Sequence, residues 1–403
     1  MATVNQIYQL VNAVSAEAFG ETSLVAHDLQ GLISMGQSLS EFGQGTRSDV
    51  FLNTLVDRIA RTVIRKLDMP IEFAEIMTDN FTYGCVLQKI SVDPMDASEY
   101  EPSKIGQVGY TPNQFAIHKP TVHQNFFDGS DAWSIKVTIP DSLFESAFTS
   151  AQEMAVFVDA ITGALVDSMT NKINDLNRLA VVNLIGEKIY SGRNVVHLIT
   201  EYNAKYSPST NLDIDTAMIN PEFFRYACKR FRDIMRYMEK PTSLFNENGV
   251  VRTTRRDNMH IFMLAEFESA ATIYLQSDTY HKELVTYPLF KPVAFWQAPN
   301  GTTTTGEGGD AVTTVNTMPD FTTASTIKLA KLASSTSTTT KAVNKSGVVC
   351  AFIDRQAIGT TIYKRNTTTD RNNDAEYTNY SSKAKMGYFN DIGNENAVVF
   401  VLD

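Results

Sequence analysis

The sequence predicts an α+β protein with an extended part, and three patterns support this fold class. WSIKVTI from Trp133 alternates apolar and polar residues, which is the period of a half-buried strand. A helical pattern then continues from Ala151 to Ile185, about 50 Å at 1.5 Å per residue and longer than a compact domain usually spans. VVCAFID and the terminal NAVVFVLD are continuous apolar runs, typical of buried strands. A helix of this length beside buried strands indicates an extended protein that connects separate parts of a larger structure.

Composition limits the possible function classes. The 403 residues are 43% hydrophobic and 20% charged, as in a globular protein of two or three domains. Forty-five acidic and thirty-five basic residues give a net charge of -10, which argues against a surface that grips nucleic acid. Cys85, Cys228 and Cys350 lack the spacing of a disulfide framework or zinc site. No signal peptide or spanning segment is evident, so we expect synthesis in cytoplasm and no membrane contact.

The first seventy residues predict two helices with little core of their own. One helix runs near Val4 to Phe19, and a Gly/Ser/Gln-rich stretch follows to about residue 50. A second helix, capped by Ser48 or Asp49, ends near Lys66 before Pro70. Its apolar positions are Leu52, Leu55, Ile59 and Val63. An arm with so little to bury is expected to be ordered by contact with a partner surface.

Between Ile71 and Asp131 the pattern predicts an extended hairpin. Two β-like runs, YGCVLQKISV and NQFAIHK, are separated by DPMDASEYEPSKIGQVGYTPN. That middle segment is rich in Pro, Gly, Ser and acidic residues, which is the chemistry of a loop. A long excursion that forms no core of its own is expected to lie on a neighbouring subunit.

The long helix has a predicted start and stop. Ser150 and Glu153 form an S-x-x-E capping box, and Gly186 is the predicted end. Its apolar stripe consists of Met154, Val158, Ile161, Leu165, Met169, Ile173, Leu176 and Leu179.

A second lobe with interleaved helices and strands follows. Asn220 and Pro221 begin a helix that stops before Pro241. Its apolar stripe is Phe224, Cys228, Phe231, Met235 and Met238. MHIFMLA and KPVAFWQ are predicted strands on either side of the helical FESAATIYLQ, which favours a central sheet. The Ser/Thr-rich segment 300–346, with strand-like AVTTV and STIKLAKL, is expected to be an exposed insertion.

No motif predicts a catalytic, cofactor-binding or metal-ligating residue. Gly301 to Gly306 has phosphate-loop glycine spacing, but Glu307 occupies the position of the required lysine. His118 and His123, five apart in a β-like segment, are expected on opposite faces. Asp354 with Glu376 is one carboxylate pair that the sequence leaves open. Basic side chains share one face of the helix after Asn220, which favours a solvated or subunit-contacting face; they are Arg225, Lys229, Arg230, Arg232 and Arg236.

These elements, in this order, resemble the Hong Kong 97-type major capsid proteins of tailed phages. The likeness is closest to small short-tailed phages of the phi-twenty-nine type. The segments that carry it are FLNTLVDRIARTVIR, WSIKVTIPDSLFESAF with the long helix, MHIFMLAEFESAA and NAVVFVLD. The resemblance implies an N-terminal arm, an extended hairpin loop, a peripheral domain with a spine helix, and an axial domain.

The resemblance also implies domain boundaries, which are 1–50 for the arm, 51–68 for a helix leading into the hairpin, 69–138 for the hairpin, 139–205 for the peripheral domain with the spine helix, 206–299 for the axial domain, 300–346 for its insertion, and 347–403 for return strands of the peripheral domain. Some members of the wider fold cross-link through a hairpin lysine. Lys89 and Lys104 are the candidates here, although the nearest group is not expected to cross-link.

The predicted function is that of a non-enzymatic major capsid protein. It would assemble with itself into pentamers and hexamers of an icosahedral virion shell, in the cytoplasm of a bacterial host. The shell would enclose double-stranded DNA without specific binding, with a separate scaffolding protein, a portal, and a possible decoration or fibre protein. An encapsulin-like compartment and a soluble α/β enzyme remain alternatives; a receptor-binding tail protein would require β-repeats, and the sequence shows none.

Overall fold

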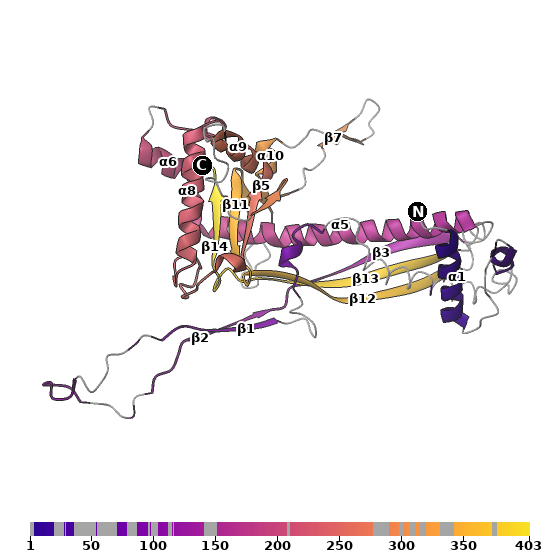
Figure 1. Cartoon of the computed structure of the whole chain (residues 1–403), viewed down its shortest axis with the longest axis horizontal. Coiled ribbons are helices and arrows are strands. Elements are labelled where there is room, and N and C mark those ends of the chain that lie inside the picture. The colour runs from indigo at the N-terminus through magenta and orange to yellow at the C-terminus, as the bar shows by residue number, and fades with distance from the viewer. Residues whose placement is uncertain are drawn as a thin grey trace.

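The computed structural model describes residues 4–19, 28, 30–35, 54, 71–78, 87–95, 97, 104–111, 115, 117–140, 151–207, 210–276, 290–297, 302–305, 311–314, 320–330, 342–372 and 377–403. A long helix, α5, runs between an upright body at one end and the N-terminal helix α1 at the other (Figure 1). A three-stranded sheet extends along α5, and a narrow hairpin projects from the base of the body away from that sheet (Figure 1). The predicted α+β class is confirmed.

The long helix exceeds its prediction. Helix α5 is Ala151–Ser191, 41 residues, so the predicted stop at Gly186 is wrong. The helix ends instead at Gly192, which has a φ of 66° and donates its N–H to the Lys188 carbonyl oxygen at 3.1 Å. Gly186 is buried where α5 enters the body. Burial of the apolar side chains around it outweighs the cost of about 1 kcal/mol for a helical glycine.

The described part of the predicted stripe of α5 is only partly buried, and the side chains of Met154, Val158 and Ile161 lie outside it. Leu165, Met169 and Ile173 are buried, but Leu176 is half-buried and Leu179 is 46% exposed. The buried face passes to a different set, namely Asn177, Ala180, Val181, Val182, Leu184 and Ile185. The change occurs because α5 leaves the three-stranded sheet and enters the core of the body, which covers different sides of the helix.

The sheet along α5 consists of three antiparallel strands in the order β12-β13-β3. They are β3 Ser130–Pro140, β12 Ile358–Asn372 and β13 Tyr377–Asn390. Helix α5 packs against one face of this sheet, where Ile139, Tyr380, Ala384 and Met386 are buried. The predicted strand from Trp133 is confirmed. Strands β12 and β13 fall in the range 347–403, where the resemblance implied return strands, but the residue pattern did not predict them individually.

The body contains a five-stranded sheet in the order β4-β14-β11-β5-β6. Its strands are β4 Val195–His197, β5 Met259–Leu264, β6 Lys291–Val293, β11 Val348–Asp354 and β14 Ala397–Val401. Every residue of β11 and β14 is buried, so the two predicted apolar strands are confirmed. Helices α8 Pro221–Met238 and α9 Ala265–Gln276 also match their predictions. The rings of Phe231, Phe352 and Phe400 join α8 to the sheet, with centroids 4.6 to 6.0 Å apart.

Shorter elements complete the body. They are α6 Leu198–Tyr206, α7 Ile214–Ala217, α10 Phe321–Ala324, the 3-10 turn Arg256–Asn258, and the two-stranded pairs β7 Thr302–Thr305 with β8 Ala311–Thr314 and β9 Ile327–Leu329 with β10 Val343–Lys345. The expectation that residues 300–346 are exposed is partly wrong. Ala324, Ile327, Leu329 and Val343 are buried and belong to the main core. Apolar side chains at alternating positions of β9 give this segment a buried face.

Helix α1, Val4–Phe19, confirms the first predicted helix and packs against α5. Val11, Val14, Leu32 and Met35 are buried. The predicted helix from Ser48 to Lys66 lies outside the described residues except for Thr54. Across the described part of the chain, no helix has the length and apolar character needed to cross a bilayer.

Candidate subunit interface

The projecting hairpin is a two-stranded antiparallel ribbon. Strand β1 Leu87–Val92 pairs with β2 Val122–Phe127, with Leu87 opposite Phe127 at the base and Val92 opposite Val122 at the far end. The first predicted run contains β1. The second prediction is wrong in position, because residues 117–120 form no strand and β2 begins at Val122. Alternation in VHQNFF is short and mixed with polar residues, so the NQFAIHK run gave the stronger strand signal.

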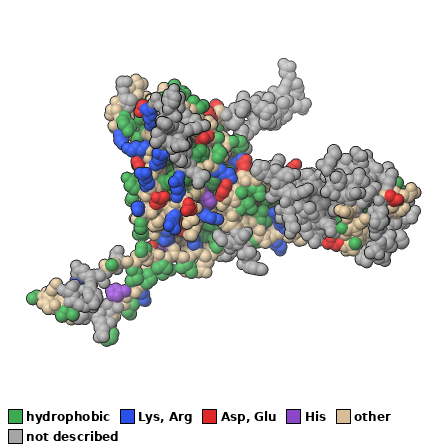
Figure 2. All heavy atoms as spheres, viewed as in Figure 1, with side chains coloured by type: hydrophobic (Ala, Val, Ile, Leu, Met, Phe, Trp, Pro, Cys, Tyr) green, Lys and Arg blue, Asp and Glu red, His purple; other side chains and the backbone are tan. Residues whose placement is uncertain are grey.

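One face of this ribbon is mostly apolar and exposed, with Gln88 and Gln124 as its polar members. Ile90, Val92, Val122 and Phe126 share the face and are 50 to 59% exposed. Beyond the strands, the loop adds Met95, Ile105, Val108, Phe115 and Ile117, which are at least 56% exposed. Apolar side chains are visible along the projecting ribbon in Figure 2. A cluster of this kind marks an interaction surface, because exposing it to water carries a free-energy cost that scales with apolar area.

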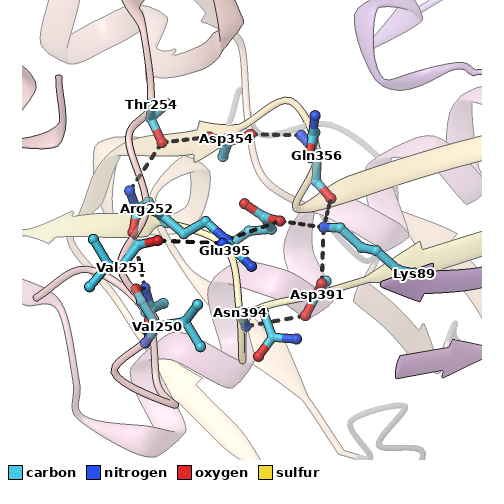
Figure 3. A network of polar contacts seen from close by, with 12 residues as sticks. Lys89, Val250, Val251, Arg252, Thr254, Asp354, Gln356, Asp391, Asn394 and Glu395 are labelled. Carbon is cyan, nitrogen blue, oxygen red and sulfur yellow. Dashed lines mark hydrogen bonds and ion pairs between the residues drawn. The ribbon is translucent and has the colours of Figure 1, made fainter. Parts of the chain in front are cut away.

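The opposite face of the ribbon is held against the body by Lys89 (Figure 3). Its Nζ lies 2.6 Å from Oε1 of Glu395 and 3.0 Å from Oδ2 of Asp391, and it donates to the Gln356 carbonyl oxygen at 3.0 Å. Asn125 on β2 donates to Oδ1 of Asp391 at 3.2 Å. The position of the ribbon is therefore fixed by buried charge. The cross-linking candidate Lys89 is engaged within its own chain.

The carboxylates that hold Lys89 belong to a larger polar network (Figure 3). Nε of Arg252 lies 3.7 Å from Oε1 of Glu395, and Asp354 accepts from Thr254 Oγ1 and, at 2.8 Å, from the Gln356 N–H. Burial raises the pKa of Glu395, while Lys89 acts to lower it. Lys89 thus lies between the carboxylates of Asp391 and Glu395, and Arg252 contacts Glu395 from a second side, whereas Asp354 is held by hydrogen-bond donors.

The chain entering the hairpin is anchored separately. Phe73, with a left-handed φ of 55°, packs its ring 5.0 Å from that of Phe262, and Ile76 is fully buried. Nζ of Lys291 lies 2.7 Å from both carboxylate oxygens of Glu75, and the pKa of this carboxyl is lowered: its burial acts to raise the pKa, but the lysine contacts outweigh it. Two independent anchors therefore define where the hairpin leaves the body.

Among the described residues, the side chains considered as candidates for a chemical site do not come together. His123 lies 2.8 Å from Asp93 by its Nε2, while His118 is exposed. Asp354 belongs to the Lys89 network, and its candidate partner Glu376 lies outside the described residues, as do Gly301 and Gly306. Lys104 Nζ lies 6.0 Å from the centroid of the Tyr110 ring. Within the described ranges, no group of three or more His, Cys, Asp or Glu side chains is arranged to hold a metal.

The predicted basic face of α8 is on the surface. Arg225, Lys229, Arg232 and Arg236 are exposed. Arg230 instead faces α6, where its Nε lies 2.8 Å from Oε2 of Glu201. Lys and Arg side chains are visible on the body in Figure 2. Sequence reasoning did not find the residues that fix the hairpin, because no motif near Asp391 or Glu395 identifies them as partners of Lys89.

The described part of the chain thus combines a projecting ribbon, a long helix with its sheet, and a separate body. A solved capsid structure of Staphylococcus phage Andhra is similar, with a TM-score of 0.50, 9% sequence identity, and coverage of 83% of this chain and 85% of that chain. The fold is thus the Hong Kong 97-like fold of phage capsids. A family model described as Phi29-like phage major capsid protein matches residues 11–401, and the chain belongs to this family.

Two further structures have lower scores. A structure of the head fibre and inner core protein gp22 of bacteriophage P68 has a TM-score of 0.44, 11% identity, and coverage of 83% and 85%. The capsid structure of Cyanophage P-SCSP1u has a TM-score of 0.42, 10% identity, and coverage of 82% and 86%. No curated protein sequence matches. The chain is a major capsid protein of a tailed phage and assembles with its own copies into an icosahedral shell, so the encapsulin-like alternative is set aside.

Proposed function

We propose that the subunit builds its shell by placing its hairpin and its N-terminal arm on neighbouring subunits. The observation that carries this proposal is the uncovered apolar face of the hairpin, formed by Ile90, Val92, Val122 and Phe126. A two-stranded ribbon is only marginally stable by itself, and its anchors hold one face only. A neighbour would cover the other face, and many weak contacts of this kind add up over a closed lattice.

The division of labour follows the domain boundaries already given. The arm, residues 1–50, the helix 51–68 and the hairpin, 69–138, would join subunits. The peripheral domain, residues 139–205 with return strands in 347–403, contains α5 and the strands β12 and β13. The axial domain, 206–299, with its insertion 300–346, would surround the axes of pentamers and hexamers. The exposed basic face of α8 fits a contact between copies there.

The subunit would act together with DNA and with other proteins of the phage. The chain carries a net charge of -10, so an enclosed double-stranded DNA would be held without specific binding. A separate scaffolding protein and a portal would direct assembly in the cytoplasm of the bacterial host, and segment 300–346 would be the site for a decoration or fibre protein. The protein would act without catalysis, since its most buried carboxylates neutralise Lys89 and Arg252.

Electron microscopy of shells tests the hairpin role. An Ile90→Ser/Phe126→Ser variant, expressed with the neighbouring phage genes, is expected to fold but give at least tenfold fewer closed shells. Leu244→Ser is the matched control, because Leu244 is 72% exposed on the body. A normal shell yield from the double variant would contradict the proposal. Deleting residues 1–45 tests the arm in the same way, and normal shells would refute its role.

A further inference from the structure

We propose that Lys188, a fully buried lysine near the end of α5, lets the base of the hairpin open more readily at neutral than at alkaline pH. The element that opens is the turn 391–396, called here the anchor turn, because its residues Asp391 and Glu395 hold Lys89 of the hairpin. The inference concerns a single subunit, so it does not depend on which surface of a neighbour the hairpin meets.

The ammonium group of Lys188 has few partners for a buried charge. Its side chain is 0% exposed, and an ammonium group carries three hydrogen-bond donors. Among the described residues its acceptor is the Ile392 carbonyl oxygen at 3.4 Å, which is long for a hydrogen bond. Oε1 of Glu247 lies 3.9 Å away, and this buried oxygen accepts no hydrogen bond from the described chain. A buried charge held so weakly favours any rearrangement that lets it reach water.

Three charged groups of the described chain act on this lysine. Glu247 approaches from the loop that follows α8, Glu187 precedes Lys188 on α5, and Arg193 follows the helix. The two carboxylates favour the charged form of the lysine, whereas Arg193 disfavours it. Burial is the largest effect and lowers the pKa of Lys188 to about 8. The two acidic residues of the anchor turn contact the hairpin lysine and Arg252 instead.

Lys188 and the loop around Glu247 hold the anchor turn together. The Ile392 carbonyl oxygen, which accepts from Lys188, also accepts the N–H of Glu247 at 3.4 Å. The next residue of that loop, Asn248, donates its N–H to the Gly393 carbonyl oxygen at 2.9 Å. Because these segments surround the ammonium group, water reaches it when they separate. Both acceptors directly follow the aspartate that holds the hairpin lysine, so this separation would also loosen the base of the hairpin.

The pH dependence of this opening has a definite sign. With the anchor turn closed the pKa of Lys188 is about 8, and contact with water returns it toward 10.5. Between these two values opening takes up a proton, so the equilibrium constant for opening falls as pH rises, by up to about tenfold per pH unit. Below about pH 8 the lysine is charged in both states, and opening is then favoured most.

Amide hydrogen exchange of the unassembled full chain tests this inference, with protection factors compared at about pH 7 and about pH 9.5. The equilibrium constant for opening should be about tenfold or more lower at the higher pH, both in the anchor turn and in strands β1 and β2. Lys188→Met should remove this pH dependence and give, at neutral pH, the low opening that the parent shows at alkaline pH. Lys172→Met is the matched control on the same helix, because Lys172 is 40% exposed, and it should leave the pH dependence unchanged.

A second variant keeps the test decisive if Lys188→Met does not fold. Glu247→Gln removes a carboxylate that favours the charged lysine, so it should increase opening at neutral pH by about threefold or more. Opening that differs by less than about twofold between the two pH values, or a pH dependence that persists in Lys188→Met, would overturn the inference. So would pH-dependent opening of the anchor turn that leaves β1 and β2 unaffected. Shell yield plays no part in this measurement, so a negative result leaves the proposed hairpin contact between subunits untouched.

Discussion

Replacing Lys89 with Met should weaken the base of the hairpin in a pH-dependent manner. The substitution removes the cation that lies 2.6 Å from Glu395 and 3.0 Å from Asp391, whose side chains are 5% and 1% exposed. It also removes the hydrogen bond to the Gln356 carbonyl oxygen. Removing one member of a buried ion pair typically costs about 3–5 kcal/mol, because the remaining charge is left uncompensated. Arg252, at 3.7 Å from Glu395, would compensate only part of this.

The sign of the pH dependence follows from Glu395. Its folded pKa is already raised by burial, so its contribution to stability is present at low pH and is lost as pH rises through the folded pKa. Without Lys89 this pKa should rise further, because the lysine acts to lower it. The destabilisation by Lys89→Met should therefore be largest near neutral pH and become smaller at about pH 5, where the Glu395 carboxyl of the variant is more protonated.

Urea unfolding of the soluble subunit at fixed protein concentration would measure this effect. Lys364→Met is the control, because an exposed lysine without a described ion pair should change stability by less than about 0.5 kcal/mol. Adding Asp391→Asn and Glu395→Gln to Lys89→Met should recover part of the loss. A loss below about 0.5 kcal/mol near neutral pH, or one of equal size at both pH values, would refute the reasoning.

Three further predictions concern stability, and thermal or urea unfolding checks each. A left-handed φ costs a non-glycine residue about 1–2 kcal/mol of stability, and Gly347→Ala should cost more, because φ is 79° and a Cβ would lie 2.7 Å from the Leu402 carbonyl oxygen. Gly192→Ala should cost only this conformational penalty, because a Cβ there would meet open space. Equal losses of stability in the two variants would contradict this prediction. Asn220→Ala should cost about 1 kcal/mol, since Oδ1 accepts from the N–H groups of Glu222 at 2.9 Å and Phe223 at 3.2 Å, while the exposed Asn211→Ala should have little effect. Burial lowers the pKa of Lys188 from 10.5 to about 8, so its contribution to stability is lost as pH falls from about 10.5 to 8. Lys188→Met should therefore make the free energy of unfolding depend less on pH in this range. Equal pH dependence in the variant and the parent protein would argue against this.

Elements with strong local signals were predicted well. Helix α8 begins at Pro221 because the Asn220 side chain caps it, and both residues are visible in the sequence. Strands β11 and β14 are buried on both faces, so their continuous apolar runs identified them. Strand β3 is covered on one face only, so its alternation of apolar and polar residues identified it.

Elements whose signal is tertiary were missed. Strand β12 carries Thr, Asn and charged residues along most of its length, so its sequence shows no apolar alternation. It forms because β13 satisfies its backbone hydrogen bonds over fourteen paired positions. The end of α5 was misplaced because a glycine that usually stops a helix is buried inside the body, where packing decides.

The sequence by itself determined the α+β class, the spine helix, the buried strands and the capsid resemblance, since these depend on periodicity and order along the chain. Only the tertiary structure decided which residues of the body hold the hairpin in place. Lys89, Asp391 and Glu395 come from distant segments, and ion pairing depends on distance in space rather than in sequence. The position of Lys364 opposite Lys385 has the same origin, because it depends on the pairing of β12 with β13.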